Sequence, residues 1–107
     1  MRLSPLDPLH YAMSATRAFT HIALHEDREA AAWADRAACS PGAHVLIAMV
    51  AVAAHALAGD DSRAAWWAER ARLRSRALTS ADFLASFPMR SAEMQTRIAV
   101  ALVRFGF

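Results

Sequence analysis

The chain has 107 residues, a length that suits one domain or a fragment of a larger protein, and 56% of them are hydrophobic. The formal net charge is +2 and all twelve basic residues are arginines, so the sequence does not predict the broad basic surface of a nucleic-acid-binding protein. Cys39 is the only cysteine, which excludes an intramolecular disulfide and a cysteine-based metal knuckle.

Abundant alanine, sparse glycine and the lack of long alternating apolar–polar runs predict an all-α fold. Cap and stop residues divide the chain into six predicted helices, at about 8–25, 28–39, 43–58, 61–76, 80–88 and 91–106. The predicted N-caps are Asp7, Asp27, Asp60 or Asp61, Thr79 or Ser80, and Ser91. Tight turns are expected to join these helices in pairs as three antiparallel hairpins.

The segment 42–59 resembles a membrane span, because it contains no Asp, Glu, Lys or Arg. It also contains His44 and His55, and amphipathic helices follow it, so we interpret it as a helix buried between neighbours. The first eight residues contain two prolines and do not form a signal-peptide pattern. We therefore expect a cytoplasmic protein that makes no contact with a membrane.

A repeat is visible when each residue is aligned with the residue 34 positions later. Residues 30–37 read AAAWADRA and residues 64–71 read AAWWAERA, so that Trp33 aligns with Trp67. His21 aligns with His55, and His25 aligns with Gly59. A period of 34 built from a helix hairpin is typical of tetratricopeptide arrays.

Small residues explain how such hairpins could pack. Alanines recur at helical spacing along the second and fourth helices, and they allow the two helices of a hairpin to approach closely. One hairpin cannot bury its own apolar face, so about three stacked units are expected. We predict a single domain over 1–107, with repeat 1 at about 8–41, repeat 2 at about 42–76 and a capping hairpin at about 79–106.

The two hairpins resemble tetratricopeptide repeats, since Gly59-Asp60 followed by Ala64, Trp67 and Ala71 matches the second-helix pattern of that family. The tail, residues 78–107, resembles the C-terminal end of repeat regions in bacterial regulators that carry a winged-helix DNA-binding domain or an adenylate cyclase domain. This likeness depends on Leu78-Thr79, Asp82-Phe83, Phe87-Pro88, Leu102 and Gly106. The resemblance implies an α-solenoid that serves as the scaffold or sensor part of a signalling or transcription-regulatory protein.

No catalytic motif stands out in the sequence. His21 and His25 have the i, i+4 spacing of metal ligands, but the repetition of His21 at His55 favours a role in helix packing. No serine lies in a Gly-x-Ser-x-Gly elbow, and the three glycines are isolated, so no phosphate-binding loop is present. The sequence predicts a protein without enzymatic activity, cofactor or metal.

Arginines and a tryptophan on the fourth helix allow two interpretations. Arg70, Arg72, Arg74 and Arg76 could contact phosphate or an acidic partner, or they could be cations favoured by the helix dipole at its C-terminal end. Trp66 could pack with Leu73 under the third hairpin, or it could be an exposed anchor for a partner. Trp66, Arg70 and Arg74 are therefore candidate interface residues.

The concave side of the array is the main candidate site. The first helices of the hairpins are expected to line an apolar groove with Phe19, Ile22, Leu46, Met49 and Leu57. An amphipathic helix could dock there, supplied by a protein partner, by a second protomer in a homodimer, or by the sixth helix of the same chain. A small apolar ligand is the alternative occupant, and direct binding of nucleic acid is not expected.

Overall fold

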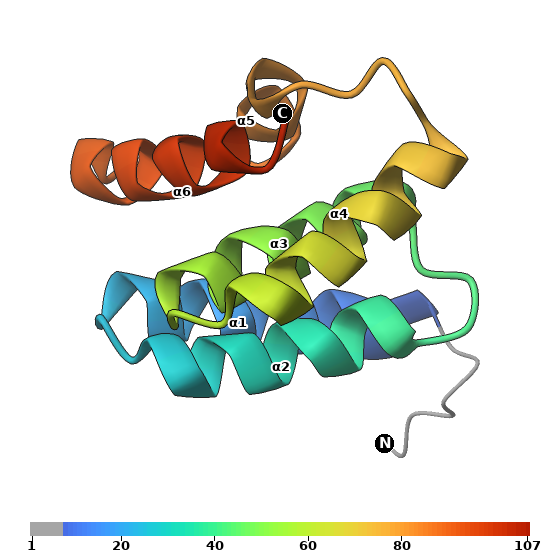
Figure 1. The fold of residues 1–107 in the computed structure, drawn as a ribbon. Helices are drawn as coiled ribbons and strands as arrows, with labels where there is room; N and C mark the ends of the chain where they lie inside the picture. Colours follow the sequence, from blue (N-terminus) through green and yellow to red (C-terminus); the bar gives the residue numbers. More distant parts are fainter. Residues whose placement is uncertain (1–7) are drawn as a thin grey trace.

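The computed structural model describes the chain from Pro8 to Phe107, with side chains described from Tyr11 onward. Within these residues the chain forms helices and no strand, which confirms the all-α prediction (Figure 1). The helices are α1 (Pro8–Ala23), α2 (Asp27–Cys39), α3 (Val45–Leu57), α4 (Asp61–Arg74), α5 (Ser80–Ser86) and α6 (Ala92–Arg104). Each lies within the range predicted for it to within one to three residues.

Most predicted caps act at the helix ends, and one does not. Asp60 accepts the Arg63 N–H, and Thr79 forms a reciprocal capping box with Asp82. The prediction that Asp27 caps the second helix is wrong, because Glu26 precedes the helix and neither side chain makes a cap hydrogen bond. The Asp27 carboxylate instead accepts from Arg97 of α6. The predicted cap Asp7 lies outside the described residues.

The backbone repeats at the turns that join α1 to α2 and α3 to α4. The Glu26 N–H donates to the His21 carbonyl at 2.8 Å, and 34 residues later the Asp60 N–H donates to the His55 carbonyl at 2.9 Å. The left-handed turn residues also correspond, with φ at 59° for His25 and 84° for Gly59. The sequence correspondence of 34 residues is therefore present in the backbone at these two turns.

Substituting Gly59 with alanine is expected to lower the free energy of unfolding by about 1 kcal/mol. A Cβ at Gly59 would meet no atom within 4 Å, so the loss would come from the left-handed backbone alone. Gly59→Asn is the control, because asparagine tolerates this conformation better than alanine. Chemical denaturation should rank the glycine, asparagine and alanine proteins in that order, and equal stabilities would contradict the assignment of the turn.

Helix α3 lies at the centre of the fold, in contact with α1, α2, α4 and α6. Its residues from Ile47 to Ala56 are all buried, so the helix is apolar on every side. This confirms that the segment 42–59 supplies a helix buried between neighbours. Among the residues that the structure describes, no helix has the length and apolar character needed to cross a membrane.

The C-terminal hairpin packs across α3 and α1, and Figure 1 shows α6 lying over α3. Phe83, Ile98 and Leu102 are fully buried and belong to the same core cluster as Ile22 and Met49. Of the two interpretations of Trp66, packing with Leu73 under this hairpin is not observed, since Leu73 is 75% exposed. The large apolar residues of the hairpin pack against α1 and α3. The side of α4 that carries Leu73 therefore stays exposed.

Candidate functional site

An aromatic cluster joins the C-terminal hairpin to the first helix. The ring of Phe19 on α1 lies 6.2 Å from that of Phe83 and 5.2 Å from that of Phe87, and the last two rings are 4.9 Å apart. These are favourable separations for tilted aromatic pairs. The hairpin therefore occupies part of the concave face, and its sixth helix is one of the three occupants that the sequence allowed there.

The predicted groove residues divide into two groups because of this coverage. Ile22 and Met49 are fully buried, in the same core cluster as Phe83, Ile98 and Leu102 of the hairpin. Leu57 is half-buried and packs against the same core. Phe19 and Leu46 remain partly accessible, and both line a cavity beside the hairpin.

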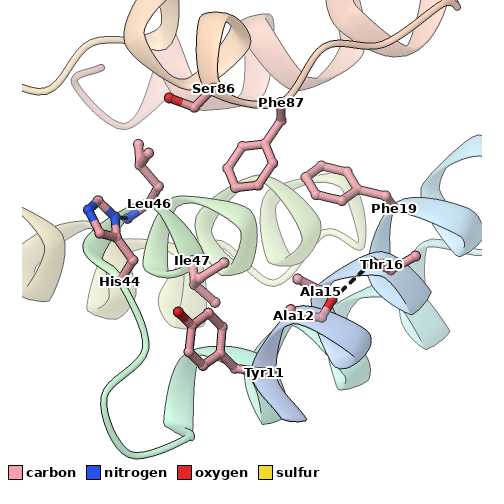
Figure 2. A pocket seen from close by; sticks show the side chains of 10 residues that line it. All are labelled: Tyr11, Ala12, Ala15, Thr16, Phe19, His44, Leu46, Ile47, Ser86 and Phe87. Carbon is pink, nitrogen blue, oxygen red and sulfur yellow. Dashed lines mark hydrogen bonds between the residues drawn. The ribbon is translucent and has the colours of Figure 1, made fainter. Parts of the chain in front are cut away.

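This cavity, which we call the concave cavity, has a volume of about 500 Å³ and lies between α1, α3 and the end of α5. Figure 2 shows the rings of Phe19 and Phe87 on one side of it and Tyr11 on the other. The hydroxyls of Thr16 and Ser86 donate to backbone carbonyls of their own helices. The lining is therefore mainly apolar, with few polar groups that could orient a ligand. The residues are Tyr11, Ala12, Ala15, Thr16, Phe19, His44, Leu46, Ile47, Ser86 and Phe87.

A polar junction centred on Asp35 joins α2, α3 and α4. The Asp35 carboxylate accepts from Trp67 Nε1 at 2.8 Å and from Arg63 Nε and Nη2 at 3.1 and 3.2 Å. His55 Nε2 lies 3.1 Å from Asp35 Oδ1. Trp67 is buried, and this hydrogen bond ties it to α2 of the first hairpin.

The junction changes the acidity of two groups. Burial alone would raise the pKa of Asp35, but the hydrogen bonds from Arg63, Trp67 and His55 outweigh it and hold that pKa below its ordinary value. Partial desolvation and the nearby Asp35 charge raise the pKa of the Cys39 thiol. The thiol is therefore less ionised than an ordinary cysteine, which disfavours a role as a nucleophile.

The candidate interface residues lie on the uncovered side of α4. Trp66 is 37% exposed, and the guanidinium carbons of Arg63 and Arg70 lie 4.3 and 3.8 Å from its ring centroid. Arg74 donates to the Ala43 carbonyl at 3.0 Å. Arg72 donates to the carbonyls of Arg76 and Leu78. Two of the four arginines in this run thus hold backbone carbonyls.

His21, His25 and His55 each lie against a carboxylate. His21 Nδ1 lies 3.0 Å from Glu26, and His25 Nε2 lies 2.7 Å from Glu93. Together with the His55–Asp35 pair, these contacts connect helices and turns. Among the described residues, no cluster of three or more His, Cys, Asp or Glu side chains is placed to hold a metal ion.

Sequence reasoning missed the Asp35 junction and the role of Arg97. Asp35 follows Ala31 by four residues and precedes Ala38 by three, so the three side chains share one face of α2. A carboxylate on a face of alanines indicates a polar group within the helix packing. Arg97 reaches from α6 to the Ile22 carbonyl and to both oxygens of Asp27. No sequence signal predicts this contact, because it joins residues 70 positions apart.

Comparisons with protein-family models, with curated proteins and with solved structures found no match. The fold and the site alone then describe the class of protein. It is an all-helical domain in which two helix hairpins have the same turn. A third hairpin covers part of its central face, and an apolar cavity remains beside that hairpin.

Proposed function

We propose that the chain is a non-catalytic, tetratricopeptide-like interaction scaffold and that the concave cavity receives an apolar helix face of a protein partner. The parent function would be regulatory, in a cytoplasmic signalling or transcription protein of the kind that the C-terminal tail resembles. Self-association belongs to this proposal as the case in which a second copy supplies the helix.

The observation that carries the proposal is the position of the concave cavity next to the α5–α6 hairpin. The face of α1 and α3 already accepts helical residues of this chain, as the contact of Phe83 and Phe87 with Phe19 illustrates. The cavity extends the same apolar face, with Leu46 and Tyr11 at its border. Apolar anchors at i, i+3 and i+4 of an amphipathic helix suit a groove of this kind.

A phage-displayed library of helical peptides, panned against the full chain, tests this function. We expect enrichment of amphipathic sequences that bind with a Kd of about 1–10 μM. Leu46→Arg should abolish their binding, because it places a charge at the cavity. Leu24→Arg is the matched control, since Leu24 is 62% exposed and does not line the cavity. Circular dichroism should show that both variants remain folded.

Panning that yields no enriched sequence family, or peptides equally sensitive to the two substitutions, would contradict the proposal. A small apolar ligand is the second candidate, because the cavity volume of about 500 Å³ lies within the range of about 300–1,000 Å³ typical of small-molecule sites. A rise in melting temperature with a compound such as indole or decanoate, absent in Leu46→Arg, would favour that candidate.

A further inference from the structure

A second, smaller cleft opens between the C-terminal end of α2, the start of α3 and the C-terminal half of α4. Ala38, Ala48 and Trp67 form its apolar part. Arg70, Leu73 and Arg74 follow one another along α4 at its border. We call this the arginine cleft. It has a volume of about 280 Å³ and shares only His44 with the concave cavity.

The charged groups at the arginine cleft have one sign. Arg70 and Arg74 are the charged residues that line it, and no carboxylate is found among its described lining residues. The half-buried carboxylate of Asp35 is held by Arg63 and by Trp67, and Trp67 also lines the cleft. Among the residues that the structure describes, the donors of the cleft therefore have no acidic partner, and the cleft attracts negative charge.

The two arginines are held in place rather than free to turn in solvent. Arg70 stacks on the Trp66 ring at 3.8 Å, and Arg74 is fixed by its hydrogen bond to the Ala43 carbonyl. Neither guanidinium forms an ion pair within the described part of the chain. Each guanidinium keeps further N–H groups that can donate to a carboxylate. Because the two side chains are already held in place, they lose little conformational entropy when a partner binds.

The apolar element between the arginines is Leu73, the most exposed of the large hydrophobic residues described. The cleft volume of about 280 Å³ lies just below the usual range for small-molecule sites, about 300–1,000 Å³. This size favours the capture of one side chain over that of a whole ligand. An apolar cleft flanked by fixed cations thus matches a segment that carries an aliphatic side chain among carboxylates.

We propose that the arginine cleft binds an acidic, leucine-containing peptide segment of a protein partner, with the leucine in the cleft and glutamates on Arg70 and Arg74. This inference rests on the proposed scaffold function and names a second contact surface for it. Nucleic acid is the less favoured occupant, since it would need a wider basic surface than these two arginines provide. Trp66 then acts by positioning Arg70 through stacking.

The probe is a synthetic, fluorescein-labelled helical peptide of fourteen residues in which leucines and glutamates share one face, measured by fluorescence polarisation. Arg70→Glu should weaken its binding by about tenfold, and Leu73→Ser by about fivefold. Arg76→Glu is the matched control, because it makes the same charge change at an exposed arginine outside the cleft. It should change the affinity by less than about twofold.

Equal losses for Arg70→Glu and Arg76→Glu would overturn the inference, as would tighter binding of a peptide with lysines in place of the glutamates. Tighter, Arg70-dependent binding of a single-stranded DNA oligomer would assign the surface to nucleic acid instead. A dimer that Arg70→Glu dissociates in sedimentation equilibrium would assign it to a second copy. If apolar peptides still require Leu46 while the acidic probe does not bind, this inference fails and the proposed function stands.

Discussion

Replacing Phe83 with alanine is expected to lower the free energy of unfolding by about 3–5 kcal/mol. Phe83 is fully buried, and its ring meets Phe19 on α1 and Phe87 at the end of α5. Its removal would leave a cavity in the layer that joins the C-terminal hairpin to the other helices. Urea denaturation followed by circular dichroism measures the loss.

Phe105→Ala is the control, because Phe105 belongs to the same hairpin but is only half-buried. A smaller loss of stability is expected there. The unfolding of Phe83→Ala should remain a single transition, since Phe83, Ile98 and Leu102 belong to the same buried cluster as Met49. Two separate transitions would show that the hairpin is a detachable arm rather than part of the core.

The order and ends of the helices could be predicted because local signals determine them. Gly59, Thr79 and Ser91 are turn and cap residues whose effect does not depend on distant contacts. The failure at Asp27 has a tertiary cause, as its carboxylate binds Arg97 instead of capping its own helix. A local rule cannot include a partner that lies on another helix.

The position of the C-terminal hairpin could be predicted only in part. The spacing of Ile98 and Leu102 indicated an apolar face that must be buried. It did not indicate whether that face meets α4, as in a regular stack, or the central helix α3. Both surfaces offered apolar residues, and the choice depends on the fit of Phe83 and Phe87 against Phe19, which no pattern in the sequence describes.

For the candidate site, too, the sequence indicated an apolar helix face but not which part of that face stays accessible. Phe19 and Leu46, two of the predicted groove residues, line the concave cavity. Ile22 and Met49 share the helical spacing of those residues, but the hairpin covers them. Periodicity identifies the face of a helix, and only the tertiary arrangement determines which part of that face stays open.

Asp35→Ala is expected to lower the free energy of unfolding by about 3 kcal/mol. The substitution leaves the Trp67 N–H and the Arg63 guanidinium without the acceptor that binds both, between α2 and α4. Thermal and urea denaturation at neutral pH measure the effect. Glu69→Gln is the control at the position that the repeat aligns with Asp35. It lies on the exposed side of α4 and should change stability by less than about 0.5 kcal/mol.

Asp35→Asn separates the charge of this side chain from its hydrogen bonds. The amide oxygen can still accept from Trp67 Nε1, but the ion pair with Arg63 is lost. The loss of stability should therefore be smaller than for Asp35→Ala. An asparagine variant as unstable as the alanine variant would mean that the negative charge, rather than the acceptor geometry, holds the junction together.

The difference in unfolding free energy between the parent protein and Asp35→Asn should depend on pH, and this dependence tests the role of the charge directly. The pKa of Asp35 lies below its ordinary value of 3.8 in the folded chain, so the unfolded chain binds the proton more readily. The stabilisation by the carboxylate is therefore complete above about pH 3.8 and is lost as the pH falls through the folded-state pKa. The stability gap between the parent protein and Asp35→Asn should narrow over that interval, because the other carboxylates are common to both. A gap that stays constant on acidification would contradict the role of the charged Asp35 at the centre of the junction.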